Sequence, residues 1–176
     1  MPTDRKGIHM EIVKVTKDTA MQASYIYAMS WKTGYRGIVP QDYLDRLPTD
    51  RWADKLGKES YPTYREDFLL LSDSGKAVAT SSVSAAREEA FRGWGEIMSI
   101  YVLPEEFRRG YGRMLFSHDC DRLREAGYRD LYLWALEDNL RARAFYEAMG
   151  FSDGGDRILQ NIGGRDLTEV RYIRRG

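Results

Sequence analysis

The sequence predicts an α/β domain with a mixed sheet and a central strand–helix–strand–helix unit. Residues 96–103 and 130–136 are rich in β-branched and aromatic side chains, and an amphipathic helical pattern follows each of them. Further strand-like segments precede this unit at 67–85 and follow it at 157–174. This alternation of strand and helix patterns is typical of an α/β domain.

The first third of the chain predicts one strand and several helices. Residues 10–15 alternate apolar and polar side chains, and from Asp18 the apolar spacing becomes three and four. Pro40 suits the first turn of a short helix, and Gly57 suits the end of another. Between the two helical stretches we expect a loop at 31–40.

The rest of the chain alternates hairpins and helices. We expect a hairpin with strands at 67–71 and 76–85, a strand at 96–103, a helix from Arg113 to Gly127, a strand at 130–136, a helix capped by Asn139 and ended by Gly150, and a last hairpin with strands at 157–162 and 167–174. The residues expected to pack the two helices are Leu115, Phe116, Cys120 and Leu123 in the first and Leu140, Ala144, Phe145 and Ala148 in the second.

Length and composition indicate a single domain without a membrane span. The chain has 176 residues and is long enough for one domain with a sizeable core, and no repeat or linker divides it. We assign residues 10–176 to a single domain, and residues 1–9 to a leader or an expression remnant without fixed order. No apolar stretch is long enough for a membrane span, and a single cysteine agrees with a reducing compartment. The cytoplasm is the expected location.

Charge argues against nucleic acid and membrane partners. The 27 basic and 27 acidic residues balance, so the chain has no bulk attraction to a polyanion. A local cluster, Arg108, Arg109 and Arg113, predicts a small anion site instead. Neither histidine suggests a metal site, because His9 lies in the patternless leader and His118 stands alone on a helix.

The most informative segment joins a strand to a helix through Gly110 and Gly112. A strand, a tight glycine loop and a helix N-terminus direct several backbone N–H groups at one point, and the helix dipole adds positive charge there. Such a loop suits a pyrophosphate, with the arginines adding charge-assisted contacts. A plain turn with solvated arginines is the alternative. The pattern is neither a P-loop, which needs a following Lys-Ser/Thr, nor a dinucleotide fingerprint, which needs a third glycine where Leu115 stands.

This segment resembles the coenzyme-A-binding motif of the GNAT superfamily of N-acetyltransferases. The glycines match, whereas Phe107 replaces the leading Arg or Gln, which removes a side-chain contact there. A second segment, 131–139 followed by Phe145-Tyr146 and Gly150-Phe151, is similar to the family's fifth strand and next helix. The resemblance implies a mostly antiparallel sheet of about seven strands, flanked by helices and splayed between the fourth and fifth strands.

The resemblance also implies the reaction. The chain would be an acyl-CoA-dependent N-acyltransferase that moves acetyl from acetyl-CoA, its co-substrate, to a primary amine by direct attack through a tetrahedral intermediate, with no metal. The residues implied to bind coenzyme A are Ile100, Tyr101, Val102, Arg108, Arg109, Gly110, Tyr111, Gly112, Arg113, Asn139 and Tyr146. Ile100 and Val102 would pair with the pantetheine arm through their backbone groups, and Asn139 would contact the same arm besides capping its helix.

Acetyl transfer to an amine sets further demands. A lysine-like amine has a pKa near about 10.4 and must lose a proton, and the leaving thiolate benefits from a proton donor. The resemblance places Tyr146 beside the thioester sulfur as the acid, and Glu96 on the fourth strand as the base. A packing tyrosine and a solvated carboxylate are the alternatives. We expect Cys120 to be buried rather than nucleophilic.

The acceptor side is the least defined part of the sequence. In this fold the first helices form the acceptor wall, which indicates Trp31, Tyr35 and Arg36, although Trp31 also suits the core. A small amine, a peptide N-terminus, a lysine and an aminoglycoside remain open as acceptors, and the acyl group could be succinyl or longer. The last hairpin allows a homodimer. A non-catalytic module that binds coenzyme A or RNA phosphates on the same fold is the alternative function.

Overall fold

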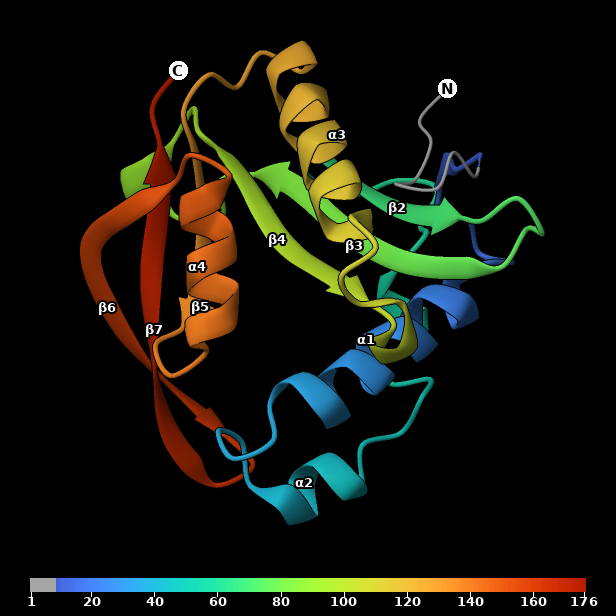
Figure 1. Cartoon of the computed structure of the whole chain (residues 1–176). Coiled ribbons are helices and arrows are strands. Elements are labelled where there is room, and N and C mark those ends of the chain that lie inside the picture. The colour runs from blue at the N-terminus through green and yellow to red at the C-terminus, as the bar shows by residue number, and fades with distance from the viewer. Residues whose placement is uncertain (1–8) are drawn as a thin grey trace.

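A computed structural model describes residues 9–176 of the chain, and its strands form one sheet in the order β1-β2-β3-β4-β5-β7-β6 (Figure 1). Neighbouring strands run antiparallel except β4 and β5, which are parallel. The strands are β1 (Glu11–Lys14), β2 (Arg65–Leu71), β3 (Ala77–Ala85), β4 (Gly95–Val102), β5 (Leu131–Leu136), β6 (Ser152–Ile162) and β7 (Arg165–Arg174). The mostly antiparallel, seven-stranded sheet predicted above is confirmed.

Helices cover both faces of the sheet. They are α1 (Ala20–Gly34), α2 (Gln41–Asp45), α3 (Tyr111–Glu125) and α4 (Leu140–Ala148), with 3₁₀ turns η1 (Ala53–Lys55), η2 (Glu89–Phe91) and η3 (Pro104–Glu106). In Figure 1, α3 lies above β3 and β4 and α4 lies in front of β5, whereas α1 lies below β3 and β4, on their other face. Alternation along β2 separates the two layers: Phe68 and Leu70 pack in the core under α3, whereas Leu69 packs in the core under α1.

Most expected elements are present, with four corrections. Strand β6 begins at Ser152 rather than at 157. Helix α1 continues to Gly34, so the predicted loop at 31–40 is shorter than expected. Helix α3 begins at Tyr111 rather than Arg113. In α4, three of the four residues expected to pack, Leu140, Ala144 and Ala148, are exposed. Phe145, Tyr146 and Met149 pack on the core instead. Helix α4 has only nine residues, too few for the apolar spacing to predict which of its faces is buried.

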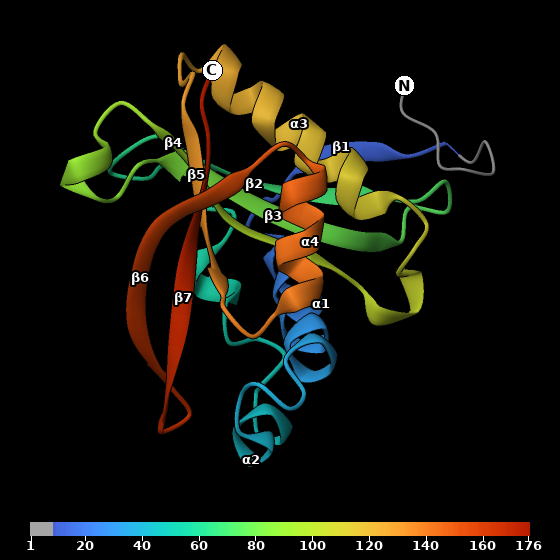
Figure 2. The same ribbon diagram turned by 60° about the vertical axis from the view of Figure 1, so that its left-hand side comes forward.

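The β6–β7 hairpin reaches the loop between α1 and α2 (Figure 2). Its turn at Gly163 and Gly164 has positive φ at both residues, as expected for a two-residue hairpin turn. Gly163 is also required by packing, because a Cβ there would lie 2.7 Å from the Cβ of Tyr43. Leu167 and Val39 join a small third core at this contact. The hairpin therefore closes one side of the space between β4 and β5.

Eight of the nine residues predicted to form a leader, 1–8, lie outside the described residues. None of the helices in the described range 9–176 is long and apolar enough to cross a membrane.

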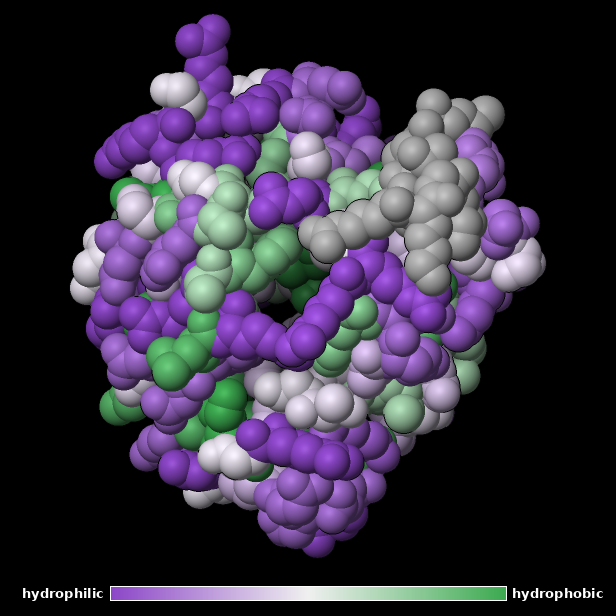
Figure 3. Space-filling view, in the orientation of Figure 1, coloured by the Kyte–Doolittle hydropathy of each residue, from purple (hydrophilic) through white to green (hydrophobic). Residues whose placement is uncertain are grey.

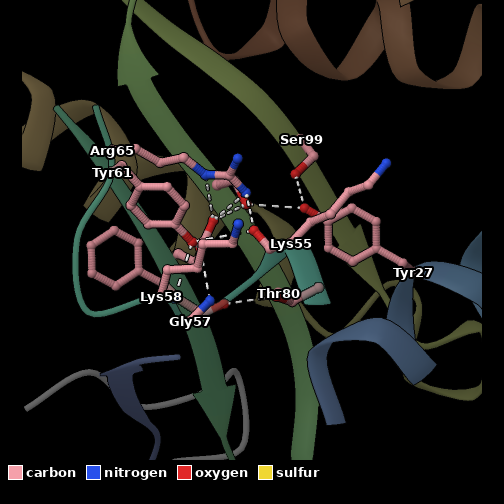
Figure 4. A network of polar contacts seen from close by, with 11 residues as sticks. Tyr27, Lys55, Gly57, Lys58, Tyr61, Arg65, Thr80 and Ser99 are labelled. Atoms are coloured by element: carbon pink, nitrogen blue, oxygen red, sulfur yellow. Dashed lines mark hydrogen bonds and ion pairs between the residues drawn. The ribbon is translucent and has the colours of Figure 1, made fainter. Parts of the chain in front are cut away.

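A buried hydrogen-bond network ties α1 to the sheet (Figure 4). Asp67 on β2, whose side chain is 1% exposed, accepts hydrogen bonds from Ser82 Oγ at 2.5 Å and from the Arg65 guanidinium at 3.0 Å. Tyr61 also donates to Asp67. The hydroxyl of Tyr27 on α1 lies 3.0 Å from Ser82 Oγ and also bonds Ser99 on β4. The network holds β2, β3, β4 and α1 in one register.

We predict that Asp67→Ala lowers the free energy of unfolding by about 3 kcal/mol, because it leaves the Arg65 charge and two hydroxyl groups without their acceptor. Urea unfolding at neutral pH measures this. The matched control is Asp42→Ala, which removes an exposed ion pair with Arg46 and should change stability by less than about 0.5 kcal/mol. Equal losses in the two variants would contradict the prediction.

Candidate active site

A cavity of about 990 Å³ lies where β4 and β5 separate. Residues from α1, β4, α3, β5, α4 and both strands of the C-terminal hairpin line it. In the orientation of Figure 1, a hollow opens near the centre of the molecule, with hydrophilic residues around it and hydrophobic residues in its depth (Figure 3). A chamber of this size that joins several elements suits a ligand much larger than water.

The cavity exists because β4 and β5 pair over only two positions. Gly95 pairs with Leu131 and Glu96 pairs with Tyr132, and no further register pair joins these strands. The strands approach closely at this point, since a Cβ on Gly95 would lie 2.9 Å from Leu131. Further along β4, Ser99 pairs with Ser82 and Ile97 pairs with Val83, so Met98 is an extra residue that bulges the strand. The predicted splay is confirmed.

Beyond the bulge, β4 presents backbone groups to the cavity. The Leu103 N–H donates to the Val78 carbonyl on β3 at 2.9 Å. Because alternate residues of an antiparallel strand face opposite neighbours, Ile100 and Val102 direct their N–H and C=O groups away from β3. Ser30 Oγ on α1 donates to the Val102 carbonyl at 2.8 Å. Both residues line the cavity, as the sequence indicated.

The glycine loop forms a second wall. Arg108 and Gly110 have positive φ, 65° and 91°, and this reversal ends η3 and starts α3 at Tyr111. The first N–H groups of α3 therefore point toward the cavity, where the helix dipole is positive. Arg108, Gly110, Tyr111, Gly112 and Arg113 line the cavity. Arg109 does not line it and forms an ion pair with Glu106 at 3.2 Å.

Gly112 is not required by the protein's own packing. A Cβ there would lie 3.6 Å from Val102 and 3.9 Å from Phe145, which are ordinary contact distances, and its φ is not in the left-handed region. The absent side chain instead leaves room on the cavity wall. This is the arrangement that a backbone-bound phosphate or pantetheine needs.

Helix α4 supplies Asn139, Arg141 and Tyr146. Asn139 Oδ1 accepts a hydrogen bond from the Ala142 N–H at 3.2 Å, so the predicted cap is present, and the residue also lines the cavity. The Arg141 guanidinium lies over the ring of Phe107 at 4.4 Å. Arg141 was not predicted from the sequence, because a lone arginine in the first turn of a helix has no distinctive pattern.

Tyr146 lines the cavity from α4, and its hydroxyl makes no hydrogen bond with the described residues. Its ring packs against Phe116, with centroids 5.7 Å apart. Burial, with a smaller contribution from nearby Tyr101, raises the pKa of Tyr146 well above its ordinary value. The phenol therefore stays protonated and can donate a hydrogen bond to a group inside the cavity.

Glu96 is buried in the cavity wall rather than solvated. Its carboxylate accepts hydrogen bonds from Arg87 Nε at 2.8 Å, Arg87 Nη2 at 2.5 Å and the Tyr132 hydroxyl at 2.9 Å. Its proposed role as base stays a prediction. An amine or a water that approached this carboxylate would compete with Arg87 and Tyr132 for its lone pairs.

Two of the three predicted acceptor residues line the cavity. Trp31 and Tyr35 pack edge to face, with centroids 4.9 Å apart, and the Trp31 N–H donates to the Tyr101 hydroxyl at 3.0 Å. Arg36 is exposed outside the cavity, and its Nε donates to the Lys32 carbonyl at 3.2 Å. Cys120 is 2% exposed in the core, and burial raises the pKa of its thiol to about 11, which disfavours a thiolate nucleophile.

Several lining residues had no sequence signal. These are Arg87 and Glu88 before β4, Trp134 on β5, and Ile158, Gln160 and Glu169 on the last hairpin. Each stands alone in its own segment, and only the sheet order brings β7 beside β5. Among the described residues, no group of three or more His, Cys, Asp or Glu side chains could hold a metal ion.

Comparisons with known proteins agree with this geometry. The model of the acetyltransferase (GNAT) family matches residues 25–151. The chain is 30% identical to the uncharacterized N-acetyltransferase YuaI of Bacillus subtilis (strain 168) over 157 residues, which cover 84% of this chain and 88% of that protein. It is 40% identical to the ribosomal protein bS18-alanine N-acetyltransferase of Salmonella typhimurium over 57 residues, which cover 32% of this chain and 38% of the relative.

A solved structure shows the same fold. The PaiA N-acetyltransferase of Thermoplasma acidophilum, in complex with coenzyme A, aligns with a TM-score of 0.72 at 16% identity, covering 96% of this chain and 99% of that one. The family match includes the glycine loop and the α4 segment, and the similarity to YuaI extends over most of both chains. The chain therefore belongs to the acetyltransferase (GNAT) family and is an N-acetyltransferase.

Proposed function

We propose that this N-acetyltransferase transfers acetyl from acetyl-CoA directly to a primary amine inside the cavity between β4 and β5. The Tyr146 hydroxyl is the observation that carries the proposal. It has no hydrogen-bond partner among the described residues, and it lies in the wall of a cavity with a cationic glycine loop and an acidic, aromatic region. The neighbouring Phe145 lies near Gly112 of the loop, and Tyr101 on β4 is close enough to affect the pKa of Tyr146.

The residues present fit coenzyme A. The N–H groups at the start of α3 and the guanidinium groups of Arg108 and Arg113 would hold the pyrophosphate. Backbone groups of Ile100 and Val102 would pair with the pantetheine arm as an added strand does, which would occupy the strand edge that β5 leaves open. Asn139 would contact the same arm through the amide N–H₂ that its capping bond leaves available.

Tyr146 would assist the departure of the thiol. As the bond between the acyl carbon and sulfur breaks, negative charge develops on sulfur, and the phenol would donate a hydrogen bond to it. The thiol's pKa, about 8.5, is below that of this phenol, so the hydrogen bond would stabilise the developing thiolate even before a proton moves. Glu96 is the base that the sequence predicts, but Arg87 and Tyr132 already occupy its carboxylate, so a cavity carboxylate without such partners would accept the amine proton more readily.

Chemistry and one relative support a primary amine as the acceptor. The bS18-alanine N-acetyltransferase, to which part of this chain is similar, acetylates an alanine of a protein, as its name states. We therefore include a primary amine in the proposal as the acceptor of this chain, and attack by the neutral amine needs no covalent acyl-enzyme.

We predict that the protein binds acetyl-CoA in the micromolar range and that Gly112→Val weakens binding at least about tenfold, or about 1.4 kcal/mol. The Cβ would fit against Val102 and Phe145 at ordinary contact distances, whereas the two γ-methyl groups would occupy cavity space beside the loop backbone. Calorimetric titration measures the affinity, and urea unfolding shows whether the variant folds.

Ser117→Ala, an exposed change on the same helix, is the control and should leave affinity unchanged. Acetyl-CoA binding that is equal in Gly112→Val and wild type would place the cofactor elsewhere. No binding at millimolar acetyl-CoA would favour the alternative, a non-catalytic phosphate-binding module.

We predict that Tyr146→Phe lowers kcat by about 10²-fold, the usual contribution of a positioned acid, while the Kd of acetyl-CoA changes less than twofold. The assay follows release of the coenzyme A thiol. Because burial keeps the phenol protonated, wild-type kcat should show no loss that is due to Tyr146 ionisation up to about pH 10. Unchanged kcat in the variant would remove this role from Tyr146.

A further inference from the structure

Four glutamates line the cavity, and they differ in their partners. Glu88 accepts hydrogen bonds from the Trp134 N–H at 2.8 Å and from Arg171 Nη2 at 2.6 Å. Glu96 is held by Arg87 and Tyr132, as described above. Glu106, near the glycine loop, forms ion pairs with Lys76 and Arg109. Of the four side chains, only the Glu169 carboxylate forms no hydrogen bond or ion pair with any of residues 9–176.

The strand register directs Glu169 into the cavity. On β7 it lies opposite Leu136 of β5 on one side and Ile158 of β6 on the other. Directly opposed residues share a face of the sheet, and both of these partners also line the cavity. Its carboxylate is therefore partly buried yet reachable from inside the cavity.

The charges around Glu169 leave it without full compensation. Burial raises the pKa of Glu169 above its ordinary value; Arg87 lowers the pKa and Glu96 raises it. Arg87 is already paired with Glu96 through two hydrogen bonds. Glu169 also raises the pKa values of two tyrosines, Tyr35 on α1 and Tyr101 on β4. Both tyrosines stay neutral, because burial raises their pKa values further. A cation is what this position lacks.

Glu169 is also near the proposed reaction centre. Tyr101, whose pKa is raised in part by Glu169, is the tyrosine that affects Tyr146. The pKa of Tyr35 is raised by both Glu169 and Tyr146. The aromatic side chains of Trp31, Tyr35 and Trp134 line the same cavity, and aromatic faces attract ammonium groups.

We propose that Glu169 binds the ammonium group of the acceptor and removes its proton. This proposal rests on the proposed function and names the class of its acceptor, a cationic primary amine. One N–H bond of the ammonium breaks and its proton bonds to the Glu169 carboxylate, which gives a neutral amine and a neutral acid. Inside a partly buried site, this exchange replaces two charges by none, so desolvation favours it.

The remaining steps transfer the acetyl group and return each proton. The amine lone pair attacks the thioester carbonyl carbon, and the carbon–sulfur bond breaks with its electron pair going to sulfur. Sulfur receives the hydrogen bond and then the proton of Tyr146, and the second proton of the attacking nitrogen restores Tyr146 directly or through water. The proton on Glu169 leaves to solvent when the amide product departs.

The test uses full-length protein with acetyl-CoA and two probe amines, alaninamide and 1,4-diaminobutane, in a thiol-release assay. Glu169→Gln should lower kcat by at least about 10²-fold and leave the Kd of acetyl-CoA within twofold of wild type. Wild-type kcat should fall at low pH with an apparent pKa above about 4.3, the ordinary glutamate value, and this acidic limb should disappear in the variant. The control is Glu11→Gln, an exposed glutamate on β1 at the far edge of the sheet.

A stability readout shows whether the variant folds. Because the pKa of Glu169 is raised in the folded protein, its ionisation destabilises the fold as pH rises through that pKa, and the protonated form is favoured below the unfolded value. Glu169→Gln should therefore raise Tm at pH 7, and the gain should shrink toward pH 4. A variant that is more stable yet slower separates a chemical role from a structural one.

Two outcomes would overturn the proposal. One is wild-type turnover in Glu169→Gln, above all if Glu96→Gln is slow, since that would assign the base to Glu96. The other comes from calorimetry on the protein loaded with coenzyme A: the two amines should bind at least about tenfold more weakly to Glu169→Gln, and equal binding or no binding to either protein would exclude the ammonium site. Binding that depends on Glu169 without any turnover would instead contradict the proposed function and leave the site standing.

Discussion

The structure depends on one break in hydrogen bonding, the separation of β4 from β5 after Glu96. A sheet normally pairs every backbone group of its inner strands, and a buried N–H or C=O without a partner costs about 1–3 kcal/mol. Here β4 keeps its bonds to β3 and gives up those to β5, although it is the middle strand of seven. The Ser30 hydroxyl satisfies one of the exposed carbonyls. The remaining groups face a cavity in which water or a ligand can serve them.

The rest of the fold keeps the two half-sheets apart. On one side, Tyr27 and Trp31 of α1 pack on Tyr101 or bond it, so this helix fixes the outer half of β4. On the other side, the guanidinium of Arg171 on β7 lies 3.8 Å from the ring centroid of Phe91 and pairs with Glu88. The third core, where the β6–β7 turn meets Tyr43, closes the remaining gap. The cavity is thus bounded by packed side chains on these sides.

Periodicity and turn chemistry were sufficient to predict the elements of the fold, because each depends on neighbours along the chain. The glycine loop and the Asn139 cap are of this kind. Burial within short elements was harder to predict. The exposed face of α4 shows that the spacing of nine residues does not determine which apolar side chains pack on the core. The position of Arg36 was also not predictable, since it depends on α1 continuing to Gly34 and turning that arginine back onto the helix.

The acceptor side could not be predicted for a different reason. Glu169 is one acid in a hairpin that also carries Asp153, Asp156 and Asp166, and no local pattern distinguishes it. The role that we propose for it depends on ion pairs made by other segments: Arg171, two residues away, pairs with Glu88 and Asp156, and Arg87 pairs with Glu96. Only the assembled sheet shows which carboxylate is left over. The proposed acceptor site therefore depends on which charged side chains are paired and which are not.

Paired and unpaired charges also occupy different regions of the cavity as a whole. Its four lining arginines are Arg87, Arg108, Arg113 and Arg141, and of these only Arg87 forms an ion pair with a described residue. The three that remain surround the glycine loop and α4, whereas the unpaired glutamate lies on β7. A chain with no net charge therefore carries a cationic region and an anionic region within one chamber. A polyanionic donor and a cationic acceptor would each be attracted to the opposite sign and repelled by the like one, so the two substrates would enter in the orientation that brings thioester and amine together.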